Sequence, residues 1–200
     1  LIGMVGVLDD VENHIGMALK DDGDVIVMVG RCNNELGGSE YLALWHGKEI
    51  GIPPQLNMQL ELNVQRLVLA AIRRGIIKSA HDLSDGGLAV AIAEMCITGK
   101  KGATLVLPSE IAPGGARLDS ILFGEAQSRI LLTLKPDDLD AFVAMTQQIK
   151  VPLFRLGTVG GGQLSIAKRT LADVQPPVIN TNIHELEWAY RGAIARIMSE

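Results

Sequence analysis

One short stretch, His81 to Gly87 (HDLSDGG), constrains the fold of this chain more than any other. It separates an apolar run at 76–80 from a helix-like apolar run at 88–97. A strand that turns through Asp, Ser and Gly-Gly into a helix directs free backbone N–H groups and the positive end of the helix dipole at one spot. The stretch therefore predicts a strand–turn–helix unit with an anion site at its turn.

The side chains of this turn leave two interpretations open. The carboxylates suit a hard cation such as Mg²⁺ that bridges to phosphate oxygens, with Asp82 as the candidate ligand. Alternatively, Ser84 or Asp85 caps the following helix, and Gly86 and Gly87 only allow close packing. The turn taken by itself does not decide between a ligand site and a capping motif.

Composition describes a globular chain and argues against several classes of protein. Of the 200 residues, 48% are apolar, 20% charged and only 4% aromatic, so an aliphatic core is expected. The formal charge of −5, with no Lys/Arg cluster longer than two residues, argues against a nucleic-acid partner. No apolar stretch approaches the ~20 residues of a membrane span, and no signal sequence opens the chain, so no membrane association is expected.

The cysteines and the first residues indicate the context of the chain. Cys32 and Cys96 lack metal-ligand spacing, which favours two reduced thiols in a cytoplasmic protein, with Cys96 on a buried helix face. The chain opens at Leu1, inside a run that reads as a strand, with no initiator Met. We expect it to be a piece of a longer protein.

Strand-like runs alternate with segments of helical period, which is typical of a layered α/β domain, and we expect one domain over 1–200. The expected strands are 2–7, 25–29, 76–80, 103–107, 129–134, 153–159 and 163–166. The expected helices are 60–72, 88–97, 136–149 and about 182–198. The first has an apolar stripe at helical spacing and is followed by a glycine cap at 75.

Two details of this arrangement are specific enough to test. Gly160–Gly162 reads as a hairpin turn between the last two strands. The final helix opens with Asn182 and Glu185, a pair typical of a capping box. Its apolar positions are expected to be buried; they are Ile183, Leu186, Tyr190, Ile194 and Ile197.

Further polar clusters precede apolar runs elsewhere in the chain. Asn34–Tyr41 contains a second Gly-Gly-Ser turn, and Phe123–Arg129 is a polar strip directly before a strand. His81 lies directly beside the Asp82 carboxylate, and we expect its ring to hydrogen-bond a neighbouring backbone carbonyl. None of the common phosphate-loop, dinucleotide or nucleophile-elbow motifs is present in the sequence.

Taken in order, these landmarks resemble one family closely. They run over nearly the whole chain as Ile2–Gly6 with Asp9-Asp10-Val11, Glu35–Tyr41, His81–Gly87, Phe123–Arg129 and Leu156–Gly160. The chain is similar to the second carboxy-terminal domain of phosphoribosylformylglycinamidine synthase of the small, unfused type. That family belongs to the superfamily of aminoimidazole ribonucleotide synthetase, and the resemblance implies a three-layer α/β/α domain with a mixed sheet.

The resemblance also implies a function for the parent protein. The parent is expected to be an ATP-dependent amidoligase of de novo purine biosynthesis. It converts formylglycinamide ribonucleotide and glutamine-derived ammonia to formylglycinamidine ribonucleotide. The implied partners are the upstream domains of the same chain, a glutaminase subunit and a small third subunit. The family's catalytic groups lie in the upstream domains, so the resemblance implies no catalytic residue here and an inactive isolated fragment.

What remains for this domain is a scaffold with an auxiliary nucleotide site. The resemblance places Asp82 toward Mg²⁺ and Ser84, with Gly86 and Gly87, toward ATP or ADP. The strip Glu125-Ala126-Gln127 carries Ala where the active half has Ser, so it is expected to be structural or to line the second site. The other residues that could line that site are Gly37, Gly38 and Ser39.

Two alternatives stay open. The chain could come from another ATP-dependent enzyme of the superfamily, of the aminoimidazole ribonucleotide synthetase or selenophosphate synthetase type, which would have only one domain upstream. It could also be a purely non-catalytic scaffold that docks partner subunits. Excising a domain from a longer chain exposes surfaces that were interfaces and leaves an edge strand open. The mean hydropathy of +0.24 is also high for this charge, so we expect the fragment to associate as a two-fold dimer.

Overall fold

In the computed structural model, which describes residues 3, 5–8, 10–112, 115–170 and 173–198, a single mixed sheet organises the chain. Its seven strands lie in the order β2-β4-β1-β5-β3-β6-β7, and all neighbours are antiparallel except β3 and β6. The strands are β1 Val25–Val29, β2 Ile77–Asp82, β3 Ala103–Leu107, β4 Ile130–Leu134, β5 Leu153–Val159, β6 Gln163–Lys168 and β7 Ile179–Asn182.

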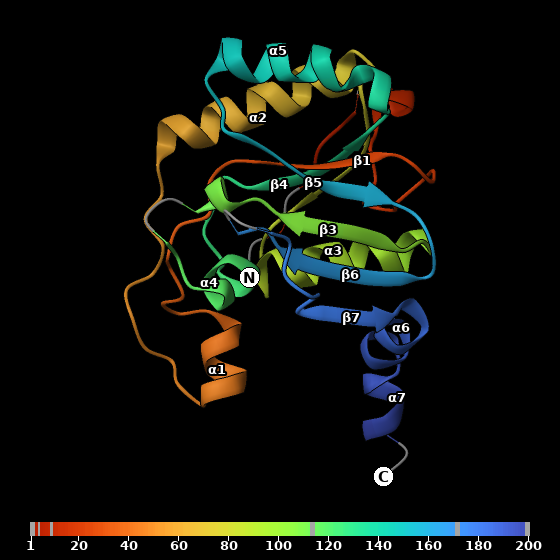
Figure 1. Ribbon diagram of the computed structural model, residues 1–200. Coiled ribbons are helices and arrows are strands. Elements are labelled where there is room, and N and C mark those ends of the chain that lie inside the picture. Colours follow the sequence, from red (N-terminus) through yellow and green to blue (C-terminus); the bar gives the residue numbers. More distant parts are fainter. Residues whose placement is uncertain (1–2, 4, 9, 113–114, 171–172, 199–200) are drawn as a thin grey trace.

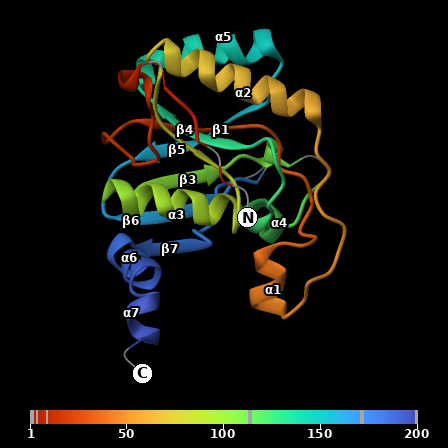
Figure 2. The ribbon, with the colours of Figure 1, turned by 180° about the vertical axis from the view of Figure 1, so that it is seen from behind.

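Helices cover the sheet on both sides (Figures 1 and 2). On one side lie α2 (Met58–Arg73) and α5 (Leu139–Ile149), and on the other lies α3 (Gly87–Gly99). The shorter helices are α1 Glu40–His46, α4 Leu118–Phe123, α6 Ile183–Arg191 and α7 Ala193–Ile197, and 3-10 turns occupy Val11–Asn13, Ser109–Ile111 and Pro136–Asp138. This arrangement confirms the predicted three-layer α/β class with a mixed sheet.

Side-chain alternation along the central strand divides the interior into two cores. Ile26 and Met28 face the α3 core, while Val25, Val27 and Val29 face the core beneath α2 and α5. All five residues of β1 are therefore buried. Burying aliphatic side chains on both faces stabilises the centre of the sheet. The cores are mainly aliphatic, as the composition predicted, with Phe142 as a fully buried aromatic residue beneath α2 and α5.

The register of the strands gathers four loops at one end of the sheet. Val29, at the end of β1, pairs with Ile130, at the start of β4, and with Leu153, at the start of β5. Asp82, at the end of β2, also pairs with Ile130. The segments that follow β1 and β2 therefore meet those that precede β4 and β5.

Several predicted elements are confirmed, and the structure adds others. The strands at 25–29, 103–107 and 153–159 have the predicted bounds, and those predicted at 76–80, 129–134 and 163–166 differ by a few residues. The short elements α1, α4 and β7 were not predicted. The strand predicted at 2–7 is wrong for Gly3 and residues 5–7, which have no regular structure. Ile2 and Met4 lie outside the described residues.

The hairpin predicted at Gly160–Gly162 is also wrong. β5 and β6 do not pair with each other, because each pairs with a different side of β3. The glycines instead wrap around Gly102, directly before β3: Gly102 N–H donates to Gly161 at 2.7 Å, and Gly160 N–H donates to Gly102 at 2.8 Å. A Cβ on Gly102 would lie 2.4 Å from the Gln163 carbonyl oxygen, so this crossing requires glycine.

The terminal helix differs from its prediction in length and burial. The capping box of Asn182 and Glu185 is present, but the helix is interrupted at Gly192 between α6 and α7. Ile183 is buried and Leu186 packs against the α3 core, whereas three predicted core residues are exposed. Tyr190 is 60% exposed, Ile194 73% and Ile197 75%. This segment leaves the sheet after its first turn, which a helical period alone does not reveal.

Both cysteines are free and buried, and Cys96 lies on the buried face of α3 as predicted. Burial raises the pKa of the Cys96 thiol to about 12, so it stays protonated at neutral pH. Within the part of the chain that the structure describes, no helix combines the length and the apolar character needed to cross a bilayer.

Candidate functional site

A single carboxylate joins three of the polar clusters that the sequence singled out. Glu125 Oε1 accepts hydrogen bonds from the backbone N–H of Gly86 at 2.8 Å and of Glu40 at 2.9 Å. Gly86 is the N-cap of α3, and Glu40 is the first residue of α1. The polar strip before β4 therefore ties the starts of two helices together.

The predicted anion position is thus occupied from within the protein. A carboxylate at a helix N-terminus interacts favourably with the dipole and satisfies an N–H group that has no partner inside the helix. The N–H of Gly87 is also used, since it donates to the Ser84 carbonyl at 3.0 Å. Glu125 takes the place that the turn appeared to offer to an external phosphate.

The two glycines of the turn have a conformational role. Gly86 and Gly87 have φ values of 75° and 63°, which side chains rarely allow. A Cβ on Gly87 would lie 2.5 Å from the Gly124 carbonyl oxygen. The prediction that Ser84 or Asp85 caps the helix is wrong, because no side chain caps α3 and both residues are exposed.

A buried arginine holds the strip in place. Arg129 is only 2% exposed, and its guanidinium donates to the carbonyls of Ala126 at 2.9 Å and Gly124 at 2.5 Å. It also lies 3.7 Å from Cys32 Sγ. Sequence reasoning included Arg129 in the strip but did not identify this role. The sequence signal that could have revealed this role is the position of Arg129, a charged residue directly before the aliphatic run of β4.

His81 connects the candidate metal ligand to α3. Its Nε2 lies 2.8 Å from Glu94 Oε2, and its Nδ1 lies 3.5 Å from Asp82 Oδ1. The expected bond to a backbone carbonyl is therefore wrong: the ring lies between two carboxylates. Glu94 also accepts a hydrogen bond from Tyr190, which couples α3 to α6.

Four predicted site residues line one cavity. Asp82, Ser84, Glu125 and Gln127 surround a hollow of about 540 Å³ together with parts of α2 and the start of β4. Asp82 is 71% exposed at its side chain, so a ligand can reach its carboxylate. The strand register explains this meeting, since the ends of β2 and β4 are paired.

The structure separates the other predicted lining residues from this cavity. Ser39 caps α1 by accepting from Leu42 N–H, and Gly38 N–H donates to Ile50 at 3.1 Å. A Cβ on Gly37 would lie 2.1 Å from the Ile52 carbonyl oxygen. This turn therefore builds the loop around α1, and its link to the cavity is the bond between Glu40 and Glu125.

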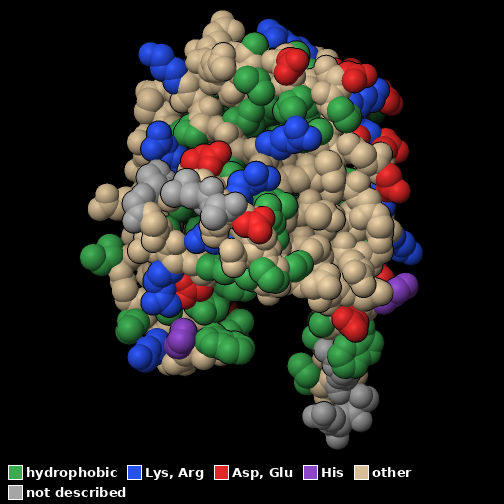
Figure 3. Space-filling view, viewed as in Figure 1, with side chains coloured by type: hydrophobic (Ala, Val, Ile, Leu, Met, Phe, Trp, Pro, Cys, Tyr) green, Lys and Arg blue, Asp and Glu red, His purple; other side chains and the backbone are tan. Residues whose placement is uncertain are grey.

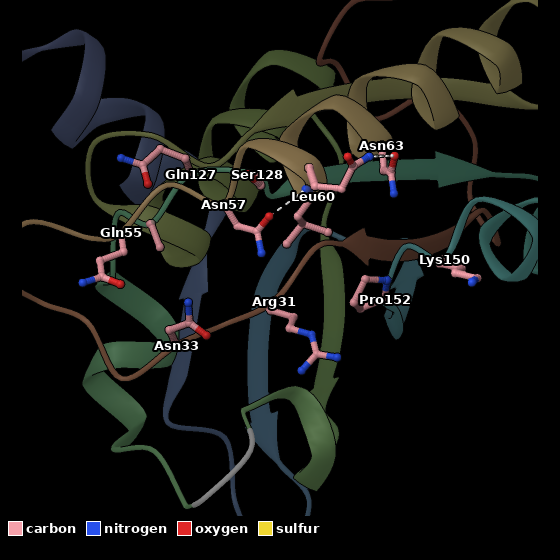
Figure 4. A pocket seen from close by; sticks show the side chains of 12 residues that line it. Arg31, Asn33, Gln55, Asn57, Leu60, Asn63, Gln127, Ser128, Lys150 and Pro152 are labelled. Atoms are coloured by element: carbon pink, nitrogen blue, oxygen red, sulfur yellow. Dashed lines mark hydrogen bonds between the residues drawn. The ribbon is translucent and has the colours of Figure 1, made fainter.

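A second cavity, of about 460 Å³, adjoins the first and shares Gln127 and Ser128 with it (Figure 4). No motif predicted it, because its residues come from four separate segments. They are Arg31, Asn33, Gln55, Asn57, Gln59, Leu60, Asn63, Ala126, Gln127, Ser128, Lys150 and Pro152.

The described residues supply only part of a metal site. Among residues 3, 5–8, 10–112, 115–170 and 173–198, no group of three His, Cys, Asp or Glu side chains is placed to hold an ion. Mg²⁺ takes six oxygen ligands in near-octahedral geometry and keeps several waters. Asp82 alone therefore does not make a Mg²⁺ site in this chain, and further ligands would have to come from outside it.

We predict that the Glu125 bonds stabilise the fold measurably. Glu125→Ala removes both bonds and should lower the free energy of unfolding by about 1–2 kcal/mol, whereas Glu125→Gln keeps an acceptor and should cost about half as much. Urea denaturation followed by circular dichroism measures both. Glu49→Gln, at an exposed loop position, is the charge-matched control. An Ala variant as stable as the wild type would contradict this role.

Comparison with known proteins gives close relatives over the whole chain. It is 42% identical over 198 residues to "Phosphoribosylformylglycinamidine synthase subunit PurL" of Alkaliphilus metalliredigens, covering 99% of this chain and 26% of the relative. It is 47% identical over 170 residues to the protein of the same name from Anaeromyxobacter sp. strain Fw109-5, covering 82% and 22%. The chain thus spans about a quarter of the length of these relatives, and the predicted resemblance is confirmed.

Solved structures and a family model agree with this. T. maritima PurL complexed with ATP superposes with a TM-score of 0.69 at 17% identity, over 88% of this chain and 28% of that one, which shows a shared fold. The family model described as "AIR synthase related protein, C-terminal domain" matches residues 21–168. The match extends from just before β1 to the end of β6 and includes the three clusters joined by Glu125. The chain therefore belongs to the AIR synthase related proteins, of which it contains the C-terminal domain.

Proposed function

We propose that these 200 residues are the second carboxy-terminal domain of a small-type phosphoribosylformylglycinamidine synthase. The proposed parent reaction joins ammonia to formylglycinamide ribonucleotide at the cost of ATP. The observation that carries the proposal is the 42% identity to a PurL subunit across 99% of the chain. The relatives' name, which calls PurL a subunit, supports membership of a complex. The proposed partners are a glutaminase and a small third subunit, and the proposed location is the cytoplasm.

Within that ligase, we assign this domain a scaffold role with an auxiliary nucleotide site. Asp82 and Ser84 line one cavity and are both exposed, which supports Asp82 as a partial Mg²⁺ ligand and the Ser84 hydroxyl as a nucleotide contact. The nucleotide, ATP or ADP, would supply phosphate oxygens to the metal. Gly86 and Gly87 would contribute by shaping the turn, because Glu125 already satisfies the N–H of Gly86.

The length of the relatives favours this proposal over a superfamily enzyme that has only one domain upstream of its carboxy-terminal domain. The chain covers 26% of a PurL relative, which leaves room for three further domains of similar size. A superfamily enzyme with one upstream domain would leave room for only one further domain. A purely structural role remains the second candidate, and the internal carboxylate at α3 favours it as an account of the turn itself.

We predict that the isolated chain folds but forms no product. It has two aliphatic cores, yet the groups that would hold ATP and the amide in reacting positions are proposed to lie in other domains. The assay supplies ATP, Mg²⁺, ammonia and formylglycinamide ribonucleotide, with the full-length ligase as the positive control. Turnover by the isolated chain above the uncatalysed background would refute the assignment.

We also predict that the nucleotide site needs the rest of the ligase. Asp82 and Ser84 provide too few oxygens for Mg²⁺ by themselves. Calorimetry of ADP with Mg²⁺ should show binding to the full-length protein that Asp82→Asn weakens about tenfold. Asp137→Asn, in the exposed turn before α5, serves as the control. Micromolar binding by the isolated chain would contradict the prediction.

A further prediction concerns association of the isolated chain. Apolar side chains are exposed on α1 and on α6–α7, where Leu44 is 83% exposed, Trp45 77% and Ile197 75%. Exposed apolar patches and open sheet edges favour pairing, and β2 and β7 are the edges here. We therefore expect a two-fold dimer in sedimentation equilibrium at about 20–50 μM. A monomer over that range would show that these surfaces do not pair.

A further inference from the structure

Asp85-Gly86, in the turn before α3, is one of two Asp-Gly dipeptides in the chain; the other is Asp22-Gly23. Such a dipeptide can rearrange without an enzyme, because glycine has no Cβ to shield its backbone nitrogen. The nitrogen bonds to the aspartate Cγ, a carboxyl oxygen leaves as water with the amide hydrogen and the carboxyl proton, and a succinimide ring forms. Water then opens the ring, and opening at the former backbone carbonyl leaves the chain linked through the side chain, as isoaspartate.

The backbone around Asp85 requires glycine at the next position. Gly87 N–H donates to the Ser84 carbonyl at 3.0 Å, so residues 84–87 form a β-turn with Asp85 and Gly86 at its centre. Gly86 has a φ of 75° and a ψ of 1°, whereas Asp85 does not have a positive φ. These values define a type II turn, whose third residue is glycine because φ is positive there. The fold therefore fixes the reactive dipeptide in place.

The geometry of the turn keeps the reacting atoms apart. A type II turn rotates the Gly86 nitrogen away from the Asp85 side chain, so the peptide plane between the two residues must rotate before the ring can close. That rotation breaks the hydrogen bond that Gly86 N–H donates to Glu125 Oε1 at 2.8 Å. Asp85 is exposed, so water can reach its carboxyl group. The Glu125 bond is therefore a restraint on the reaction that comes from outside the turn.

The charge of Glu125 adds to this restraint. The glycine nitrogen attacks as it loses its hydrogen, and a carboxylate oxygen 2.8 Å away opposes negative charge on that nitrogen. Glu125 does not follow the turn when the turn opens, because Glu40 N–H also donates to it at 2.9 Å. Removal of the carboxylate would release the nitrogen and remove the opposing charge together.

We infer that Asp85-Gly86 is a latent modification site at which isoaspartate forms spontaneously, and that Glu125 restrains the reaction by holding the Gly86 N–H. Isoaspartate adds one methylene to the backbone directly before α3. Asp85 lines the same cavity as Asp82 and Ser84, so this change would displace the turn between β2 and α3. The inference goes beyond the proposed nucleotide site and holds whatever that cavity binds.

The second Asp-Gly dipeptide is a matched control. Asp24 N–H donates to the Asp21 carbonyl at 3.3 Å, which closes a turn around Asp22 and Gly23. Gly23 has a φ of 89° and Asp22 does not have a positive φ, so this turn is also of type II. Gly23 N–H donates to the Val159 carbonyl at 2.9 Å, not to a carboxylate.

This control turn is far from the Glu125 carboxylate. It directly precedes β1, and the register places the start of β1 at the end of the sheet opposite the end of β2. In Figure 3, acidic side chains line the edge of the molecule at which β1 begins in Figure 1. The rate at Asp22 therefore reports the stability of the domain as a whole and not the Glu125 bond.

Isoaspartate measured by peptide mass spectrometry tests the inference in the full-length protein that carries this chain. Wild type, Glu125→Ala and Glu125→Gln are incubated at neutral pH, and wild type unfolded in urea gives the unrestrained rate. We expect Asp85 to react at least about tenfold more slowly in the folded wild type than in the unfolded protein. Glu125→Ala should raise the folded rate about tenfold and Glu125→Gln, which keeps a neutral acceptor, about threefold, with Asp22 unchanged.

A further variant assigns the product to this dipeptide. Asp85→Glu, combined with Glu125→Ala, lengthens the side chain by one methylene, and the larger ring closes far more slowly. Loss of the product from the peptide that contains residue 85 supports the assignment, and its persistence would overturn it. Equal rates at Asp85 in wild type and both Glu125 variants would also overturn the inference. So would a rise at Asp85 matched by an equal rise at Asp22, because unfolding of the whole domain would then be the cause.

Discussion

The Glu125 carboxylate is the interaction on which the arrangement of this end of the molecule depends. It accepts from Gly86 and Glu40, so one oxygen fixes the starts of α3 and α1 against the strip before β4. The strip is itself held by Arg129, whose buried guanidinium donates to its carbonyls. A negative and a positive group, each bonded to the backbone, thus shape a loop that otherwise has no regular structure.

The sheet explains why these loops meet at all. Because β4 is antiparallel to both β1 and β2, its start lies beside their ends, and the start of β5 lies there too. The two adjoining cavities form where these segments converge, with Gln127 and Ser128 between them. One cavity contains the exposed carboxylate and hydroxyl of the turn, and the lining of the other includes Arg31, Lys150 and several carboxamides. The same topology therefore builds two adjoining cavities, of which only the first is lined by acidic residues.

Local patterns predicted the elements whose burial and period are simple. β1, β3 and β5 have their predicted bounds. All five residues of β1 are buried, whereas β3 is buried at alternate positions and β5 only at Leu156 and Val159, so the apolar and β-branched residues of the sequence rather than continuous burial marked the last two. The crossing at Gly160–Gly162 was misread, since a glycine turn does not reveal which strand lies between its neighbours. The exposure of α7 was missed for a similar reason: an apolar period shows a face but not whether anything covers it.

The candidate site was predictable in part. The turn, the strip and the Gly-Gly-Ser loop were all identified from sequence, but their connection through one carboxylate depends on long-range pairing. Amide hydrogen exchange tests this connection most directly, with Glu125→Ala compared to the wild type. The account predicts that the Gly86 and Glu40 amides lose protection, while Gly87, bonded to Ser84, keeps its own. Unchanged protection at Gly86 and Glu40 would contradict it.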